Sequence, residues 1–156
     1  MLYFRPILVL ALIILILGII FFAWQFTWNG AIDLSVNVEW NQQILIIKGK
    51  TTLPDTAILS YEIGPADENT LAEEGIYASG IAVVKKGQYS TQLDTSLFPP
   101  GDIKVWVLFQ LESTGRIQPP EIVNRYGVYG QYLKGKHVIK ENDHYRLEVS
   151  KVIPKN

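Results

Sequence analysis

The sequence predicts a mainly β protein with a single N-terminal transmembrane helix, followed by a β-sandwich of about seven strands with one short helix. Three observations lead to this prediction. No residue from Ile7 to Phe26 carries a charge. After this uncharged segment, apolar and polar residues alternate in short segments, and turn residues separate these segments. We therefore expect four regions: a terminus over 1–6, a helix over 7–26, a linker over 27–31 and a domain over 32–156.

Residues 7–26 have the length and composition of a membrane span. Twenty residues at about 1.5 Å each make a helix about 30 Å long, which matches the hydrocarbon thickness of a bilayer. A cleaved signal peptide is the alternative, but large aromatic residues occupy the positions where its cleavage site needs small ones. We therefore expect an uncleaved signal-anchor in the lipid bilayer, with Arg5, Trp24 and Trp28 at the membrane interfaces.

The charges that flank this segment predict its orientation. Arg5 is the one charged side chain before the apolar segment, and Asp33 and Glu39 are the first charged residues after it. The positive-inside rule then places the N-terminus in the cytoplasm. The C-terminal domain is expected on the extracellular or periplasmic side of a plasma (inner) membrane.

The charge of the chain is nearly balanced but unevenly distributed. Residues 29–124 contain 6 Lys and Arg against 12 Asp and Glu, whereas residues 125–156 contain 7 against 3. The basic part could meet an acidic partner or lipid headgroups, or the two parts could pair within one fold, which we favour. Without cysteine there are no disulfides. No clustered basic surface with interleaved aromatic residues indicates a nucleic-acid partner.

Alternation and turn residues predict the individual strands of the domain. Strands are expected over 32–40, 43–48, 57–63, 76–84, 88–94, 103–111, 138–140 and 145–152. Residues 64–75 are polar and acidic, which is typical of a solvated loop. Pro119 and Pro120 before residues 121–126 and Gly127 after them predict a short helix.

This spacing of strands is typical of an immunoglobulin-like or fibronectin type III-like β-sandwich, with a small barrel as the alternative. Two turn sequences resemble those of bacterial membrane-anchored immunoglobulin-like modules. They are Gly49-x-Thr51-x-Leu53-Pro54-Asp55, and Gly87-x-Tyr89 leading to Phe98-Pro99-Pro100-Gly101-Asp102-Ile103-x-Val105. The sequence departs from those modules at Asp102-Ile103, where they usually place a tyrosine or phenylalanine. The resemblance covers about 60 residues and implies a fold rather than a function.

The residues that could support catalysis or bind a metal are few. His137 and His144, with Glu141 or Asp143, could bind a divalent metal, but two solvated turn histidines are the preferred interpretation. Asp67, Glu68, Glu73 and Glu74 lack the spacing of a calcium loop, so a solvated acidic loop is preferred. No nucleophile, phosphate-binding or dinucleotide motif occurs. We therefore predict no catalytic residues, no metal, no cofactor and no small-molecule substrate.

Aromatic residues supply the candidate contact residues. Trp106 and Leu108 lie on one face of a predicted strand whose other face is already apolar, so they either lie beneath another segment or form an exposed stripe that contacts a protein. Tyr126, Tyr129 and Tyr132 stand among glycines, a composition that suits a packed loop or a contact surface.

These observations predict a non-catalytic, single-pass accessory subunit. Its outer domain would scaffold or cover a larger assembly of other membrane protein subunits. The alternative is an independent membrane-anchored module that binds a soluble ligand, a glycan or a cell-wall polymer.

Overall fold

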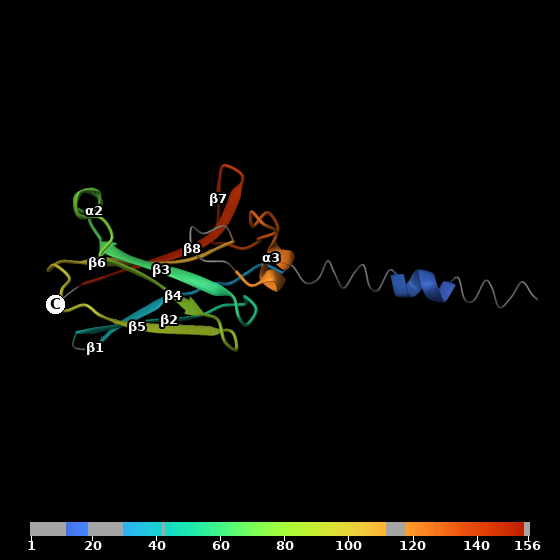
Figure 1. The fold of residues 1–156 in the computed structure, drawn as a ribbon, viewed down its shortest axis with the longest axis horizontal. Coiled ribbons are helices and arrows are strands. Elements are labelled where there is room, and N and C mark those ends of the chain that lie inside the picture. Colours follow the sequence, from blue (N-terminus) through green and yellow to red (C-terminus); the bar gives the residue numbers. More distant parts are fainter. Residues whose placement is uncertain (1–11, 19–29, 42, 112–117, 155–156) are drawn as a thin grey trace, which may run out of the picture. The chain divides into compact units, whose positions relative to one another are not determined.

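The computed structural model describes residues 12–18, 30–41, 43–111 and 118–154 of the 156-residue chain. The chain divides into two compact units, Met1–Gly30 and Ala31–Asn156. The second unit contains all the strands and two short helices (Figure 1).

The first unit corrects the predicted membrane anchor. Its described residues 12–18 are helical. No helix within the described ranges is long and apolar enough to cross a membrane. This finding contradicts the transmembrane helix over 7–26, and with it the signal-anchor and the single-pass location in a plasma membrane. Arg5, Trp24, Trp28 and most of the predicted span lie outside the described residues.

Three strands form the smaller sheet of the second unit. They are β1 (Asn37–Asn41), β2 (Ile44–Lys50) and β5 (Gln88–Asp94), in the antiparallel order β1-β2-β5. Leu45 and Ile47 on β2 are fully buried, while Ile46 and Lys48 between and after them are half-buried and Lys50 at the end of the strand is exposed. This alternation is the period-2 pattern of a sheet with one face in a core and one in water.

Five strands form the larger sheet. They are β3 (Ile58–Pro65), β4 (Ala78–Val83), β6 (Ile103–Gln110), β7 (Val138–Glu141) and β8 (His144–Ile153), in the order β4-β3-β6-β8-β7. All neighbouring strands are antiparallel. The central strand β6 alternates strictly between buried and half-buried residues.

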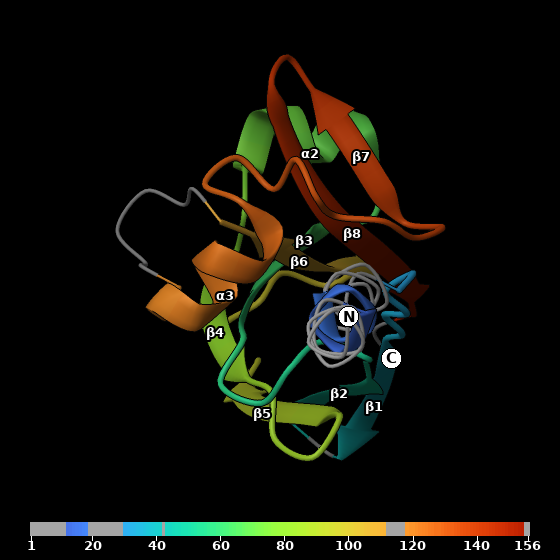
Figure 2. The ribbon, with the colours of Figure 1, turned by 90° about the vertical axis from the view of Figure 1, so that its right-hand side faces the viewer.

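The two sheets share one hydrophobic core. Figure 2 shows β1, β2 and β5 in one layer and β3 and β6 in another. Buried side chains from both layers form a single cluster, including Leu45 and Ile47 from the smaller sheet and Val105, Val107 and Phe109 from the larger one. The mainly β, two-sheet part of the prediction is therefore confirmed.

Two short helices lie between strands in the second unit. Helix α2 (Glu68–Glu74) occupies the segment predicted as a loop, and the Asp67 carboxylate accepts a hydrogen bond from the Thr70 amide at 2.8 Å. Helix α3 (Pro120–Tyr126) confirms the short helix predicted between proline and glycine. Since the described residues of the second unit contain α2 and α3, the expectation of one short helix in the β domain was too low.

The first predicted strand is shorter than its alternation suggested. Strand β1 begins at Asn37, and the residues before it continue its register only through a bridge between Leu34 and Thr51 and two backbone hydrogen bonds. The Ser35 amide donates to the Lys50 carbonyl at 3.0 Å, and the Thr52 amide donates to the Asp33 carbonyl at 3.1 Å. The Ile32 amide donates instead to the Lys134 carbonyl at 2.7 Å. Ile32 and Leu34 are both buried, so the alternation marks burial correctly although the regular strand begins later.

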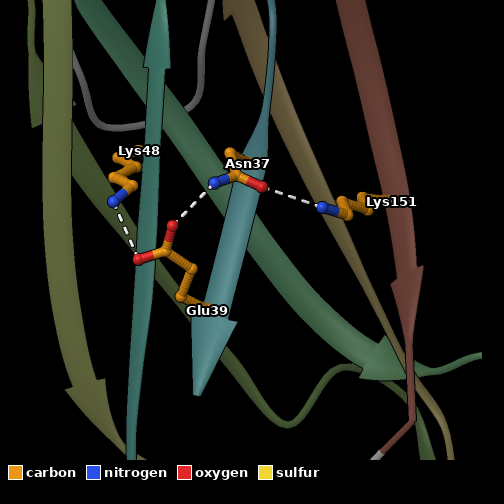
Figure 3. A network of polar contacts seen from close by, with 4 residues as sticks. All are labelled: Asn37, Glu39, Lys48 and Lys151. Atoms are coloured by element: carbon orange, nitrogen blue, oxygen red, sulfur yellow. Dashed lines mark hydrogen bonds and ion pairs between the residues drawn. The ribbon is translucent and has the colours of Figure 1, made fainter. Parts of the chain in front are cut away.

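Polar contacts join the two sheets along one side, between β1 and β8 (Figure 3). Lys151 Nζ donates to Asn37 Oδ1 at 2.9 Å, and Asn37 Nδ2 donates to Glu39 Oε1 at 2.9 Å. Lys48 Nζ lies 2.7 Å from Glu39 Oε2. The hydrogen bond from Lys48, together with that from Asn37, lowers the pKa of the Glu39 carboxyl. The indole of Trp40 adds a bond to the Pro154 carbonyl at 3.1 Å.

Candidate functional site

The outer face of the five-stranded sheet carries the predicted contact residues of β6. Ile103, Val105, Val107 and Phe109 point into the core, because each is at most 1% exposed. Trp106 and Leu108 alternate with them and are half-buried on the other face. The prediction that these two residues lie opposite a fully apolar face is confirmed.

The strand register extends this face over the neighbouring strands. Leu108 lies opposite Ser60 on β3, and Ser60 lies opposite Ile81 on β4. Directly paired residues of antiparallel strands project to the same side of a sheet. By this rule six apolar residues share one side, which we call the outer apolar face: Ile58, Ile81, Val83, Trp106, Leu108 and Val152.

Several members of the outer apolar face are strongly exposed. Ile81 is 44% exposed, Val83 52% and Val152 51%. Small and polar residues separate the apolar ones, since Ser60 lies between Ile81 and Leu108, and Ser150 lies opposite Trp106. The result is a diagonal apolar stripe across β4, β3, β6 and β8, bordered by polar side chains.

Charged residues flank the tryptophan. Lys104 Nζ lies 4.9 Å from the centroid of the Trp106 ring, a distance at which the cation is attracted to the ring face. Glu62 lies opposite Trp106 on β3, and Glu148 lies opposite Leu108 on β8. An apolar centre with a charged border is the usual composition of a protein-binding surface.

The structure separates the three predicted contact tyrosines. Tyr126 is 2% exposed, and its ring packs edge-on against Phe109 with 5.7 Å between centroids. Burial raises the pKa of its hydroxyl. Tyr129 and Tyr132 are 49% and 52% exposed. Tyr126 is therefore a core residue, whereas Tyr129 and Tyr132 remain available for contact.

Tyr129 lies beside a small cavity at the β7–β8 hairpin. The cavity has a volume of about 220 Å³. Its walls include Gln110, Tyr129, Glu141, His144 and Arg146. The guanidinium of Arg146 forms ion pairs with Glu141 and Glu148, and the rings of Tyr129 and His144 meet edge-on at 5.1 Å. These contacts pair the polar side chains of the hairpin with one another.

The two histidines do not lie together. The His137 carbonyl accepts a hydrogen bond from the Glu148 amide, while His144 pairs with Glu141. Glu148 and His144 are four residues apart on β8, so roughly 13 Å separates these positions along the strand. Among the described residues, no three or more His, Asp or Glu side chains gather into a group that could hold a metal ion.

Sequence analysis missed several residues of the outer apolar face. Ile81, Val83 and Val152 could have been found, because Ile81-Ala82-Val83-Val84 and Val152-Ile153 are consecutive apolar residues within alternating segments. Consecutive apolar residues in a strand place apolar side chains on both faces. The same signal had identified Trp106 and Leu108.

No protein-family profile matches this chain, and no curated protein is similar to it.

Proposed function

We propose that the β domain is a non-catalytic module that binds another protein through the outer apolar face and so helps to hold a larger assembly together. The observation that supports this most directly is the exposure of Ile81, Val83 and Val152 beside the half-buried Trp106 and Leu108. The inner face of the same sheet already supplies the core.

Apolar side chains on the outer apolar face are in contact with water, and covering them with a partner protein is favourable. Burial of apolar surface stabilises an interface by about 25 cal/mol per Å², and clustered apolar residues contribute more than scattered ones. Tryptophan is enriched among the residues that dominate binding energies. Trp106, with Lys104 over its ring, would form the centre of such an interface.

A comparative affinity purification of the full-length chain tests this function. We expect a stoichiometric protein partner with the native chain and a loss of that partner with Trp106→Asp. Replacing a central tryptophan should weaken binding by at least about 2 kcal/mol, or about 30-fold. Gln92→Asp is the matched control, because Gln92 is exposed on the outer side of the other sheet.

Thermal unfolding of both variants separates binding from folding. Both should unfold within a few degrees of the native chain, since neither position lies in the core. Equal recovery of the partner by Trp106→Asp and the native chain would show that the outer apolar face does not bind it.

A further inference from the structure

A groove on the other sheet concentrates positive charge. It has a volume of about 650 Å³, lies over β1, β2 and β5 and the turn before β5, and reaches Val83 at the end of β4. Three lysines and four residues with hydroxyl or amide side chains line it, and we call it the lysine groove: Lys48, Lys50, Lys85, Ser35, Asn37, Gln88 and Ser90. No residue that lines it is acidic, although the whole chain has a net charge of −1.

The three lysines differ in how far they are neutralised. Lys48 pairs with Glu39 at the border of the groove (Figure 3). Lys50 and Lys85 are exposed, and within the described part of the chain neither forms an ion pair. Their charges therefore face the solvent above the groove and would attract an anionic ligand.

The spacing of these groups follows the strand. Lys48 and Lys50 are alternate residues on β2, so they project to the same side about 7 Å apart. Lys48 lies opposite Asn37 and Ser90, and Lys50 lies opposite Gln88. An extended peptide repeats its side chains on one face at this same distance. Carboxylates at alternate peptide positions would thus match Lys50 and, in exchange for its contact with Glu39, Lys48, beside amide and hydroxyl partners.

We propose that the lysine groove binds an acidic polypeptide segment in an extended conformation. The groove offers no exposed aromatic ring, on which sugars and nucleic-acid bases stack. Tyr89, its one aromatic residue, is 4% exposed and donates its hydroxyl to the Ser35 carbonyl at 2.6 Å. This chemistry favours a peptide over a polysaccharide or a single-stranded nucleic acid.

Fluorescence polarisation with the full-length chain tests the proposal. The probe is a labelled synthetic peptide of alternating glutamate and serine, and the comparison ligands are a heparin oligosaccharide and a single-stranded oligonucleotide. We expect the peptide to bind more tightly than either. Its affinity should fall as salt is raised, because charge pairs carry the binding.

Charge reversal locates the site. Lys50→Glu combined with Lys85→Glu should weaken peptide binding at least tenfold. Lys134→Glu combined with Lys136→Glu is the matched control, since both lysines are exposed and neither lines the groove. The control should bind as the native chain does, and so should Trp106→Asp, which separates this site from the outer apolar face.

Three results would overturn the proposal. The first is no binding of the acidic peptide by a folded native chain. The second is equal loss in the two double variants, which would show a general effect of net charge. The third is binding of heparin or the oligonucleotide as tightly as the peptide, which would show unselective attraction of polyanions.

Discussion

Gln118 shows how one buried side chain can replace a missing strand partner. It is 4% exposed, and its side-chain amide bonds both backbone groups of Ile58. Gln118 Oε1 accepts a hydrogen bond from the Ile58 amide at 2.9 Å, and Gln118 Nε2 donates to the Ile58 carbonyl at 2.7 Å. It also donates to the Gln110 carbonyl at 3.1 Å. The side chain thus connects the start of β3 to the end of β6.

We predict that Gln118→Leu destabilises the domain by about 2 kcal/mol. The substitution would leave buried backbone groups of Ile58 and Gln110 without partners, which costs about 1–3 kcal/mol. Urea unfolding followed by circular dichroism measures the change, with the exposed Gln92→Leu as control. A loss below about 0.5 kcal/mol, the usual range for a surface substitution, would contradict this role.

Gly49 is a second residue whose identity the packing requires. A Cβ atom at this position would lie 1.9 Å from the Ser35 carbonyl oxygen and 2.6 Å from the Tyr89 hydroxyl. The close approach allows Tyr89 to donate its hydrogen bond to Ser35. Backbone atoms of residue 35 cannot move aside as a flexible side chain would.

We therefore expect Gly49→Ala to destabilise the domain by about 2–3 kcal/mol through overpacking. The lowered midpoint of thermal or urea unfolding measures this effect. Gly30→Ala is the control, because a Cβ at Gly30 meets no atom within 4 Å. Similar midpoints for the two variants would show that the Ser35–Gly49 contact is not tight in solution.

Single residues were the hardest to assign from the sequence. Tyr126, Tyr129 and Tyr132 stand in the same glycine-containing segment, and no periodicity distinguishes the buried one from the exposed two. Burial of Tyr126 depends on its contact with Phe109, 17 residues earlier in the chain. Gln118 likewise gives no local signal, since its partners lie on β3 and β6.

At the scale of elements, long alternating segments were predictable and short helices were not. The predicted strand over 88–94 matches β5, and 103–111 matches β6 to within one residue. Helix α2 has seven residues, none of them buried, so it lacks the apolar period that marks a packed helix. Its N-cap residue Asp67 was noted only as a member of an acidic cluster.

The cap of α2 should make its stability depend on pH. Hydrogen bonds from the Thr70 amide and hydroxyl lower the pKa of the Asp67 carboxyl below its usual 3.8. A lowered folded-state pKa gives stability that is present above the unfolded-state value and is lost as pH falls through the folded-state value.

Thermal unfolding of the native chain and Asp67→Asn measures this dependence. Asparagine keeps an acceptor at the N-cap but does not titrate over this range. We predict that the difference in Tm between the two proteins decreases as pH is lowered from about 5 to about 2. A constant difference over that range would show that the carboxylate does not stabilise α2.

At the scale of the whole molecule, alternation predicts strands but not their partners. Strand β2 pairs with β1 and β5, and β6 pairs with β3 and β8, choices that depend on contacts between distant segments. The membrane span over 7–26 was predicted from composition alone. The structure corrects it, because no helix within the described ranges is long and apolar enough to cross a membrane.

The two proposed surfaces lie mainly on different sheets and meet at one residue. The outer apolar face belongs to the five-stranded sheet, and the lysine groove lies over the three-stranded one but also reaches Val83 on β4. The shared core lies between the two layers. Substitution of Trp106, which does not line the groove, is therefore expected to leave peptide binding unchanged, as is substitution of Lys50 and Lys85 for binding at the outer apolar face.

Site-specific photo-crosslinking tests the central claim, that the outer apolar face binds a protein, most directly. A photoreactive amino acid is placed in the full-length chain at Ile81, at Val152 and, as control, at Gln92. We expect the same crosslinked partner from positions 81 and 152, which lie on β4 and β8 of one face, and none from position 92 on the other sheet. Crosslinks from position 92 alone, or from none of the three positions, would contradict the claim.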